Sequence, residues 1–119
     1  MKFSTSLKKN YEFKRLYNRG KSAASSYAAV YFRKNGSSEN RLGITVSIKL
    51  GGAVERNRVK RRLKEIYRIN EEKLSRGYDI VIVARMRSRH SGFHELEGSV
   101  LSLFKKLKLC GDNGAGDRA

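Results

Sequence analysis

The sequence has few acidic residues, one cysteine, no proline and no tryptophan. Eleven Asp and Glu stand against 27 Lys and Arg in 119 residues, which leaves a formal net charge of +16. The single Cys110 excludes a disulfide within the chain and is typical of a reducing compartment. Apolar runs such as 80–84 are far too short to span a bilayer, and residues 1–10 lack the apolar segment of a secretion signal. We therefore expect one small cytoplasmic domain.

The positive charge is concentrated in the first part of the chain. Residues 1–70 hold 18 basic and 4 acidic side chains, whereas residues 71–119 hold 9 and 7. Phosphate backbones suit such a surface, because each neutralised phosphate releases condensed counterions. A membrane partner would need an amphipathic helix with its apolar face open to lipid, and the helices expected here need those faces for the core. We predict a nucleic-acid partner, no membrane partner and no small-molecule substrate.

Hydrophobic periodicity predicts an α+β fold with the order α-β-β-α-β-α. The first two strands are expected to pair as a hairpin across the turn at 35–40, and the Ile-Val-Ile-Val run predicts a third strand covered on both faces. The result is a two-layer sandwich, in which helices pack a small mixed sheet. Helices are predicted over about 10–17, about 53–75 and from about 92 onward, and strands over 26–34, 42–48 and 78–85.

This pattern also predicts the domain organisation. Residues 1–109 form a single RNA-binding domain, because every predicted element contributes apolar residues to one core. Residues 110–119 are rich in glycine and have nothing to bury, so we predict a disordered tail.

The second predicted helix carries the strongest functional signal. Positions 56–68 hold seven basic side chains and one acidic side chain. At 100° per residue, an apolar seam that includes Val59 and Leu63 can face the sheet, which leaves a rigid basic face for phosphates. A merely solvated face is the alternative, but glutamate is too scarce for i,i+4 pairing to explain the charges. The predicted RNA-binding residues of this helix are Arg56, Asn57, Arg58, Lys60, Arg61, Arg62, Lys64 and Arg68.

Aromatic side chains among cations indicate a second surface. Phe13 and Tyr17 form an i,i+4 pair that flanks Lys14, and Tyr27 and Tyr31 share one face of a predicted strand. Bases of a single strand stack on such rings for ~1–3 kcal/mol each while the phosphates meet the cations. The alternative places the same rings in the core between helix and sheet, and the residues alone leave both interpretations open.

Signs of an active site on the protein itself are weak. The histidines and carboxylates of 90–97 can be read as metal ligands, but a glycine separates the histidines at a helix start and the chain offers no carboxylate cluster elsewhere for Mg²⁺. Cys110 has no base placed beside it, and Gly51-Gly52 lacks the Gly-Lys-Ser/Thr of a phosphate-binding loop. We predict no catalytic residue, no metal site and no cofactor held by this chain.

The run 46–62 resembles the signature of the protein component of bacterial ribonuclease P. Its hallmark is Arg-Asn-Arg followed by an apolar residue, Lys and Arg, which is intact at 56–61. The segments 7–22 and 78–85 also fit the family, and the resemblance covers about residues 4–108. The positions that depart from the family pattern are Ser25, Ser26, Ile48 and Gly52.

The resemblance implies an accessory subunit of a ribozyme that removes the 5′ leader of precursor tRNA. In that family the RNA subunit performs the hydrolysis with bound Mg²⁺, so the holoenzyme is an endoribonuclease whose catalytic centre is not on the protein. It further implies that the basic helix docks on the catalytic RNA, and that the strand–helix–strand crossover is left-handed, against the usual right-handed preference. The leader-binding cleft that it implies consists of Phe13, Lys14, Tyr17, Tyr31 and Lys49.

Two other hypotheses follow from the same composition. A ribosomal or other structural RNA-binding protein would share the basic helix and the small α+β fold without a processing role. A nuclease that acts without an RNA subunit would need carboxylates to bind its metal ions, and their scarcity disfavours it.

Overall fold

The computed structural model describes residues 4–7 and 9–109, so the predicted tail, including Cys110, lies outside the described residues. Three short 3-10 turns connect the main elements: η1 (Ile48–Leu50), η2 (Glu71–Lys73) and η3 (Met86–His90). The helices and strands, in chain order, are β1 (Ser4–Ser6), α1 (Asn10–Arg19), β2 (Lys21–Ala24), β3 (Ala28–Lys34), β4 (Asn40–Val46), α2 (Ala53–Asn70), β5 (Tyr78–Ala84) and α3 (Phe93–Lys106).

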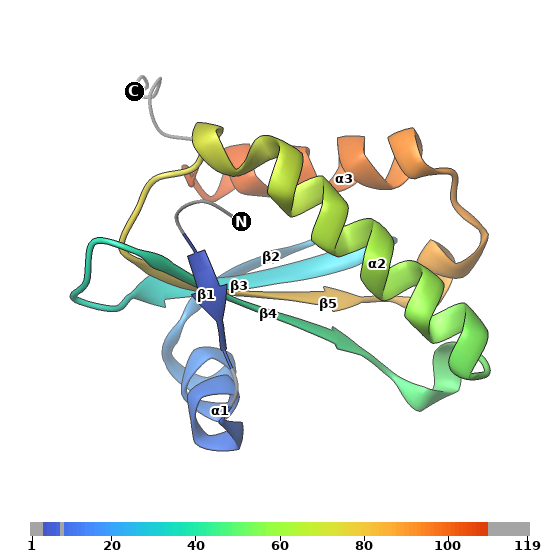
Figure 1. Ribbon diagram of the computed structural model, residues 1–119, viewed down its shortest axis with the longest axis horizontal. Helices are drawn as coiled ribbons and strands as arrows, with labels where there is room; N and C mark the ends of the chain where they lie inside the picture. The colour runs from blue at the N-terminus through green and yellow to red at the C-terminus, as the bar shows by residue number, and fades with distance from the viewer. Residues whose placement is uncertain (1–3, 8, 110–119) are drawn as a thin grey trace.

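The described strands form one mixed sheet in the order β1-β4-β5-β3-β2. Helices α2 and α3 cover one face, and α1 lies against the other (Figure 1). The predicted α+β class, with helices packed on a small mixed sheet, is confirmed; α1 adds a layer on the second face. β1 and β2 went unpredicted because both are short and mainly polar, so no apolar alternation marks them.

The predicted hairpin between the first two long strands is wrong. β5 lies between β3 and β4, antiparallel to the first and parallel to the second. The physical reason is burial, because Ile80, Val81 and Ile82 are completely inaccessible to solvent. A strand that is apolar on both faces is best placed at the centre of a sheet covered on both sides.

The main core lies between the sheet and the pair α2 and α3. Leu63, Ile66 and Tyr67 of α2 meet Ile82 of the sheet and Phe104 of α3, all fully buried. Burying one such apolar side chain contributes about 1.5–3 kcal/mol. This seam follows the predicted helical spacing, and it turns the opposite side of α2 outward. α2 ends at Asn70, earlier than the predicted position 75, because the chain tightens into η2.

The connection from β4 through α2 to β5 joins two parallel neighbours. In Figure 1 both strands point to the right, β4 lies nearer the viewer than β5, and α2 returns above the sheet from right to left. This path has the left-handed sense that the resemblance implied and that few such connections adopt. It places the first turn of α2 just beyond the carboxyl end of β4, next to η1.

Candidate nucleic-acid interface

The first turn of α2 is anchored by Glu55. Its carboxylate accepts a hydrogen bond from the Gly52 backbone N–H at 3.2 Å and from Arg89 Nε at 3.0 Å. Arg89 also donates to the Leu50 carbonyl at 3.2 Å, which ties η3 to η1 beneath the helix. Glu55 is therefore already bonded to protein groups, so it does not neutralise the neighbouring cations of α2, which remain available to bind a ligand.

Five of the exposed polar or cationic side chains on the outward side of α2 form a surface that we call the basic face. Their positions follow from the buried seam, which uses the remaining side of the helix. Within the described part of the chain, none of these five side chains forms a hydrogen bond or an ion pair. Such donors, fixed on a rigid helix, match the phosphates of a nucleic acid. The basic face consists of Asn57, Arg58, Lys60, Arg61 and Lys64.

The other three predicted residues of α2 are held by the protein. Arg56 Nε donates to the Gly51 carbonyl at 3.1 Å, and Arg62 Nη1 donates to the Ser91 carbonyl at 2.8 Å. Arg68 donates twice to Glu65, at 2.9 and 2.6 Å. These hydrogen bonds from Arg68 lower the pKa of Glu65. An ion pair at i,i+3 therefore accounts for Arg68, one of the eight predicted RNA-binding positions. The sequence analysis had considered pairing at i,i+4 alone.

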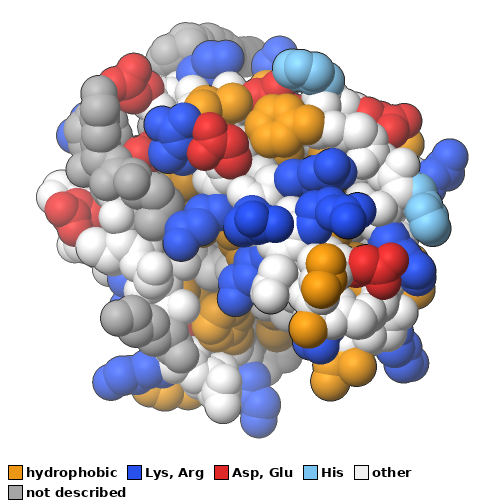
Figure 2. All heavy atoms as spheres, turned by 45° about the vertical axis from the view of Figure 1, so that its right-hand side comes forward, with side chains coloured by type: hydrophobic (Ala, Val, Ile, Leu, Met, Phe, Trp, Pro, Cys, Tyr) orange, Lys and Arg blue, Asp and Glu red, His pale blue; other side chains and the backbone are white. Residues whose placement is uncertain are grey.

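Two shallow depressions cross the basic face. One is lined by Val54, Asn57, Lys60, Arg61 and Lys64. Figure 2 shows Lys and Arg side chains gathered in the middle of the face that lies over this part of the molecule. The cations thus surround concave surface rather than projecting singly, which suits a bound phosphate chain. The second depression shares Arg61 with the first and is lined by Arg58, Arg61, Arg62, Glu65 and Phe93.

Tyr17 and Tyr31 come together on the opposite side of the sheet, and we call this pair the aromatic surface. Their ring centroids are 4.9 Å apart in an edge-to-face arrangement. The Tyr17 hydroxyl lies 3.4 Å from Thr45 Oγ1, which links α1 to β4. Tyr17 is 40% exposed, whereas Tyr31 is half-buried. One ring therefore remains open for stacking, while the other supports it from below.

Phe13 has a mainly structural place. It is half-buried against the small cluster of Leu7, Leu16 and Val81, and its ring covers Gly43. A Cβ at position 43 would lie 2.6 Å from two ring carbons, so glycine makes this close approach possible. For Phe13 the structure supports the alternative that the sequence had left open, a ring packed between helix and sheet.

The two cations predicted for the cleft are both exposed. Lys14 lies on α1, and Lys49 lies in η1 beyond the end of β4. Among the described residues, neither lysine side chain interacts with Tyr17 or Tyr31. The structure therefore brings together the aromatic residues of the predicted cleft, Phe13, Tyr17 and Tyr31.

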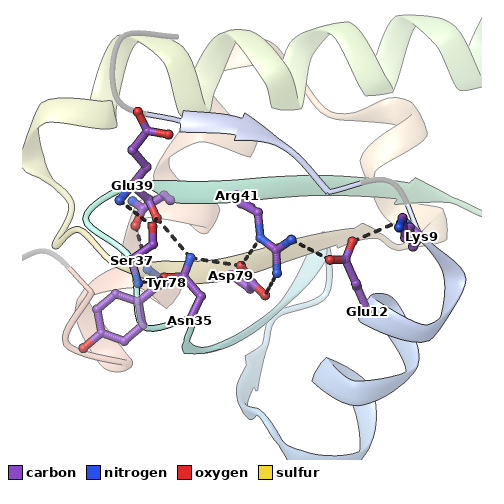
Figure 3. A network of polar contacts seen from close by, with 9 residues as sticks. Lys9, Glu12, Asn35, Ser37, Glu39, Arg41, Tyr78 and Asp79 are labelled. Carbon is purple, nitrogen blue, oxygen red and sulfur yellow. Dashed lines mark hydrogen bonds and ion pairs between the residues drawn. The ribbon is translucent and has the colours of Figure 1, made fainter.

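Sequence reasoning missed a partly buried ion-pair network, which we call the Arg41 clamp (Figure 3). Arg41 of β4 donates to both oxygens of Asp79 on β5, at 2.8 and 2.7 Å, and to Glu12 of α1 at 2.5 Å. Asn35 donates to Asp79 at 3.1 Å. The hydrogen bond to Asp79 is the main cause that raises the pKa of Arg41. The clamp fixes α1, and with it Tyr17, against two strands.

The candidate metal ligands of 90–97 are dispersed. His94 is 94% exposed and lies 3.6 Å from Glu97, while Glu95 accepts a hydrogen bond from Tyr27 at 2.7 Å. This bond to Glu95 is the main reason that the pKa of Tyr27 is raised. Within residues 4–7 and 9–109, no three His, Cys, Asp or Glu side chains lie close enough to hold a metal ion.

The four positions that depart from the family pattern have distinct environments. Ser25 is partly buried, and its hydroxyl lies 2.6 Å from that of Ser99 and accepts hydrogen bonds from the backbone N–H groups of Tyr27 and Ala28, where β3 begins. Ser26 is exposed, and Ile48 is 78% exposed. A Cβ at Gly52 would meet no atom within 4 Å, so a side chain there would project into solvent.

The α+β fold, the unpaired basic face and the aromatic surface define a small RNA-binding protein. No helix in the described part of the chain is both long and apolar enough to cross a membrane. The comparisons with known proteins give the family. The family model described as ribonuclease P matches residues 1–108. The chain belongs to the ribonuclease P protein family, as the signature at 56–61 had predicted.

The similarity extends over almost the whole chain. The ribonuclease P protein component of Alkaliphilus oremlandii is 44% identical, over 92% of this chain and 96% of that protein. That of Clostridioides difficile is 46% identical, over 87% of this chain and 91% of that protein. The solved RNase P protein of Staphylococcus aureus superposes with a TM-score of 0.82 at 32% identity, and covers 92% of this chain and 98% of that one. The Thermotoga maritima protein gives 0.78 at 35% identity, with 85% and 96% covered.

Proposed function

We propose that the chain is the protein subunit of ribonuclease P in the bacterial cytoplasm. It binds the catalytic RNA through the basic face of α2 and the 5′ leader of precursor tRNA through the aromatic surface, and it assists endonucleolytic removal of the leader. The observation that carries this proposal is the basic face itself: five exposed donors that have no partner among the described residues, on a helix whose other side is buried, in a chain of this family. The hydrolysis, and the Mg²⁺ that it uses, belong to the RNA.

The basic face contributes electrostatic free energy. The buried seam of Val59, Leu63 and Ile66 holds the helix against the sheet, so the helix itself need not be ordered when RNA binds, and the entropic cost is limited to the side chains. The partial positive charge at the start of α2 adds to the same field. Cations placed between RNA segments reduce phosphate repulsion, which lowers the Mg²⁺ concentration that the RNA needs to fold and to bind its substrate.

The aromatic surface contributes selectivity. A base of the leader can stack on the open ring of Tyr17, since Tyr31 already holds that ring by an edge contact. Mature tRNA has no leader and gains nothing from this contact. The subunit thus favours the precursor over the product by binding a segment that only the precursor has.

Tyr17→Ala is expected to weaken binding of precursor tRNA to the holoenzyme by about 5- to 140-fold, which corresponds to one lost base–ring stack of ~1–3 kcal/mol. Binding of mature tRNA should stay unchanged. Tyr11→Ala is the matched control, because Tyr11 is 55% exposed on the same helix and has no contact with Tyr31. Tyr17→Phe should retain most of the affinity, since it keeps the ring and loses only the Thr45 contact. Dissociation constants for both tRNAs, measured without turnover, check this.

Equal losses for precursor and mature tRNA would contradict the leader-binding role. They would favour the alternative of a structural RNA-binding protein without a processing role. A loss in Tyr11→Ala as large as that in Tyr17→Ala would show that the aromatic surface has no special part in binding.

A further inference from the structure

A second concave basic surface lies at the far edge of the sheet from α2. It is a depression with an apolar floor of Phe32, Tyr78 and Leu107. The Phe32 and Tyr78 rings are 5.3 Å apart and tilted, and Tyr78 is half-exposed. No acidic side chain lines it among residues 4–7 and 9–109. We call its five cations the edge patch: Arg19, Lys21, Arg33, Lys34 and Lys108.

The fold brings these cations together from separate elements. Arg19 ends α1, Lys21 begins β2, and Arg33 and Lys34 end β3. The sheet register aligns Lys21 with Phe32 and Lys34 with Tyr78, so the charges border the floor. Lys108 follows α3 in the left-handed region, at φ 61°, a conformation that favours glycine. The backbone conformation at this position does not favour lysine, and the lysine found there adds one positive charge to the edge patch.

The cations of the edge patch have no partner in the part of the chain that the structure describes. None of them makes an ion pair or a side-chain hydrogen bond with another residue that the structure describes. Asp79 stands opposite Arg33 in the β3–β5 register, but its carboxylate is held by Arg41 and Asn35. Five uncompensated charges around one depression repel one another, and a polyanion relieves that repulsion.

We infer that the edge patch is a second phosphate-binding surface for RNA, in addition to the basic face and the aromatic surface. The cations take phosphates while the half-exposed Tyr78 contacts a ribose or base, a combination that suits RNA better than an acidic peptide. β2 is the edge strand beyond β3, whereas α2 packs over β4 at the other side of the sheet. The edge patch therefore holds a different segment of the catalytic RNA from the one on α2. This inference rests on the proposed function.

The test compares two charge-matched variants of the full chain. Lys21→Gln with Lys34→Gln removes two cations of the edge patch, and Lys73→Gln with Lys105→Gln removes two exposed lysines outside it. Affinity for the catalytic RNA is measured from 0.05 to about 0.5 M salt. Loss of two phosphate contacts should reduce the slope of log K against log salt by about 1.4–1.8 and the affinity at 0.15 M by about 15- to 30-fold. The control pair should lose no more than about threefold.

A third variant, Arg58→Gln, tests whether the two surfaces bind separate segments. Its loss should add to that of the edge-patch variant on a logarithmic scale. Equal losses in the edge-patch and control variants would overturn the inference, as would full RNA affinity in the edge-patch variant, which would leave an acidic protein as the occupant. Failure of the proposed function gives a distinct result, because the unsubstituted chain would then show no selective binding of the catalytic RNA and Arg58→Gln would have no effect.

Discussion

Replacing Arg58, Arg61 and Lys64 together with glutamine is expected to weaken binding of the catalytic RNA by about 50- to 170-fold at 0.15 M salt. Each neutralised phosphate contributes about 0.7–0.9 to the slope of log K against log salt, so three lost contacts remove about 2.1–2.7. These side chains are exposed and have no partners among the described residues, and glutamine is a good helix former. The loss therefore reports RNA contacts rather than unfolding. Binding across a salt series measures it.

Arg68→Gln is the matched control on the same helix. Its guanidinium is already paired with Glu65, so its removal should cost less than any one of the three. An unchanged salt slope in the triple variant would contradict the role of the basic face. A loss in Arg68→Gln as large as that of Arg61→Gln would show that net charge, rather than the unpaired face, determines binding.

Arg41→Met is expected to destabilise the fold by about 2–3 kcal/mol, because it leaves a nearly buried carboxylate without its cation. The Asp79 side chain is 8% exposed and, within the described ranges, keeps only its bond from Asn35, while Glu12 loses its partner on β4. The Arg41 side chain is itself 34% exposed, which places the loss below that of a fully buried pair. For a domain of this size the melting temperature should fall by about 8–20 °C. Denaturant unfolding and thermal melting measure the change.

Arg33→Met is the matched control, since Arg33 also lies opposite Asp79 in the sheet but forms no hydrogen bond or ion pair with it. It should change the free energy of unfolding by no more than about 0.5 kcal/mol. Equal losses in the two variants would mean that the Arg41 clamp contributes nothing specific. The Arg41→Met protein that remains folded should also show a weaker preference for precursor tRNA over mature tRNA, because Glu12 no longer holds α1 and Tyr17 against β4.

Local periodicity was enough to predict α2 and its buried seam. Val59, Leu63 and Ile66 recur at helical spacing, and this alone determines which side of the helix faces out. Strand pairing is a different problem, because alternation shows that β3 and β4 are strands and says nothing about which strand lies between them. The hairpin prediction failed there, when the apolar β5 took the central position.

The same division holds for the functional surfaces. The basic face lies on one continuous segment and was predictable, but the sequence did not show that the protein itself holds Arg56, Arg62 and Arg68. The Arg41 clamp depends on the parallel register of β4 and β5, which aligns Arg41 with Asp79. The edge patch joins cations from residue 19 to residue 108, and only the folded chain brings them together.

The most direct test of the proposed function is cleavage of 5′-labelled precursor tRNA at low Mg²⁺. Three reactions are compared: the protein alone, the catalytic RNA alone, and both together. We predict cleavage at the mature 5′ end in the mixture and little or none in either separate reaction, because in the proposed function the RNA performs the chemistry and the protein supplies binding and charge. Cleavage by the protein alone, or no gain when the protein is added to the RNA, would contradict this account.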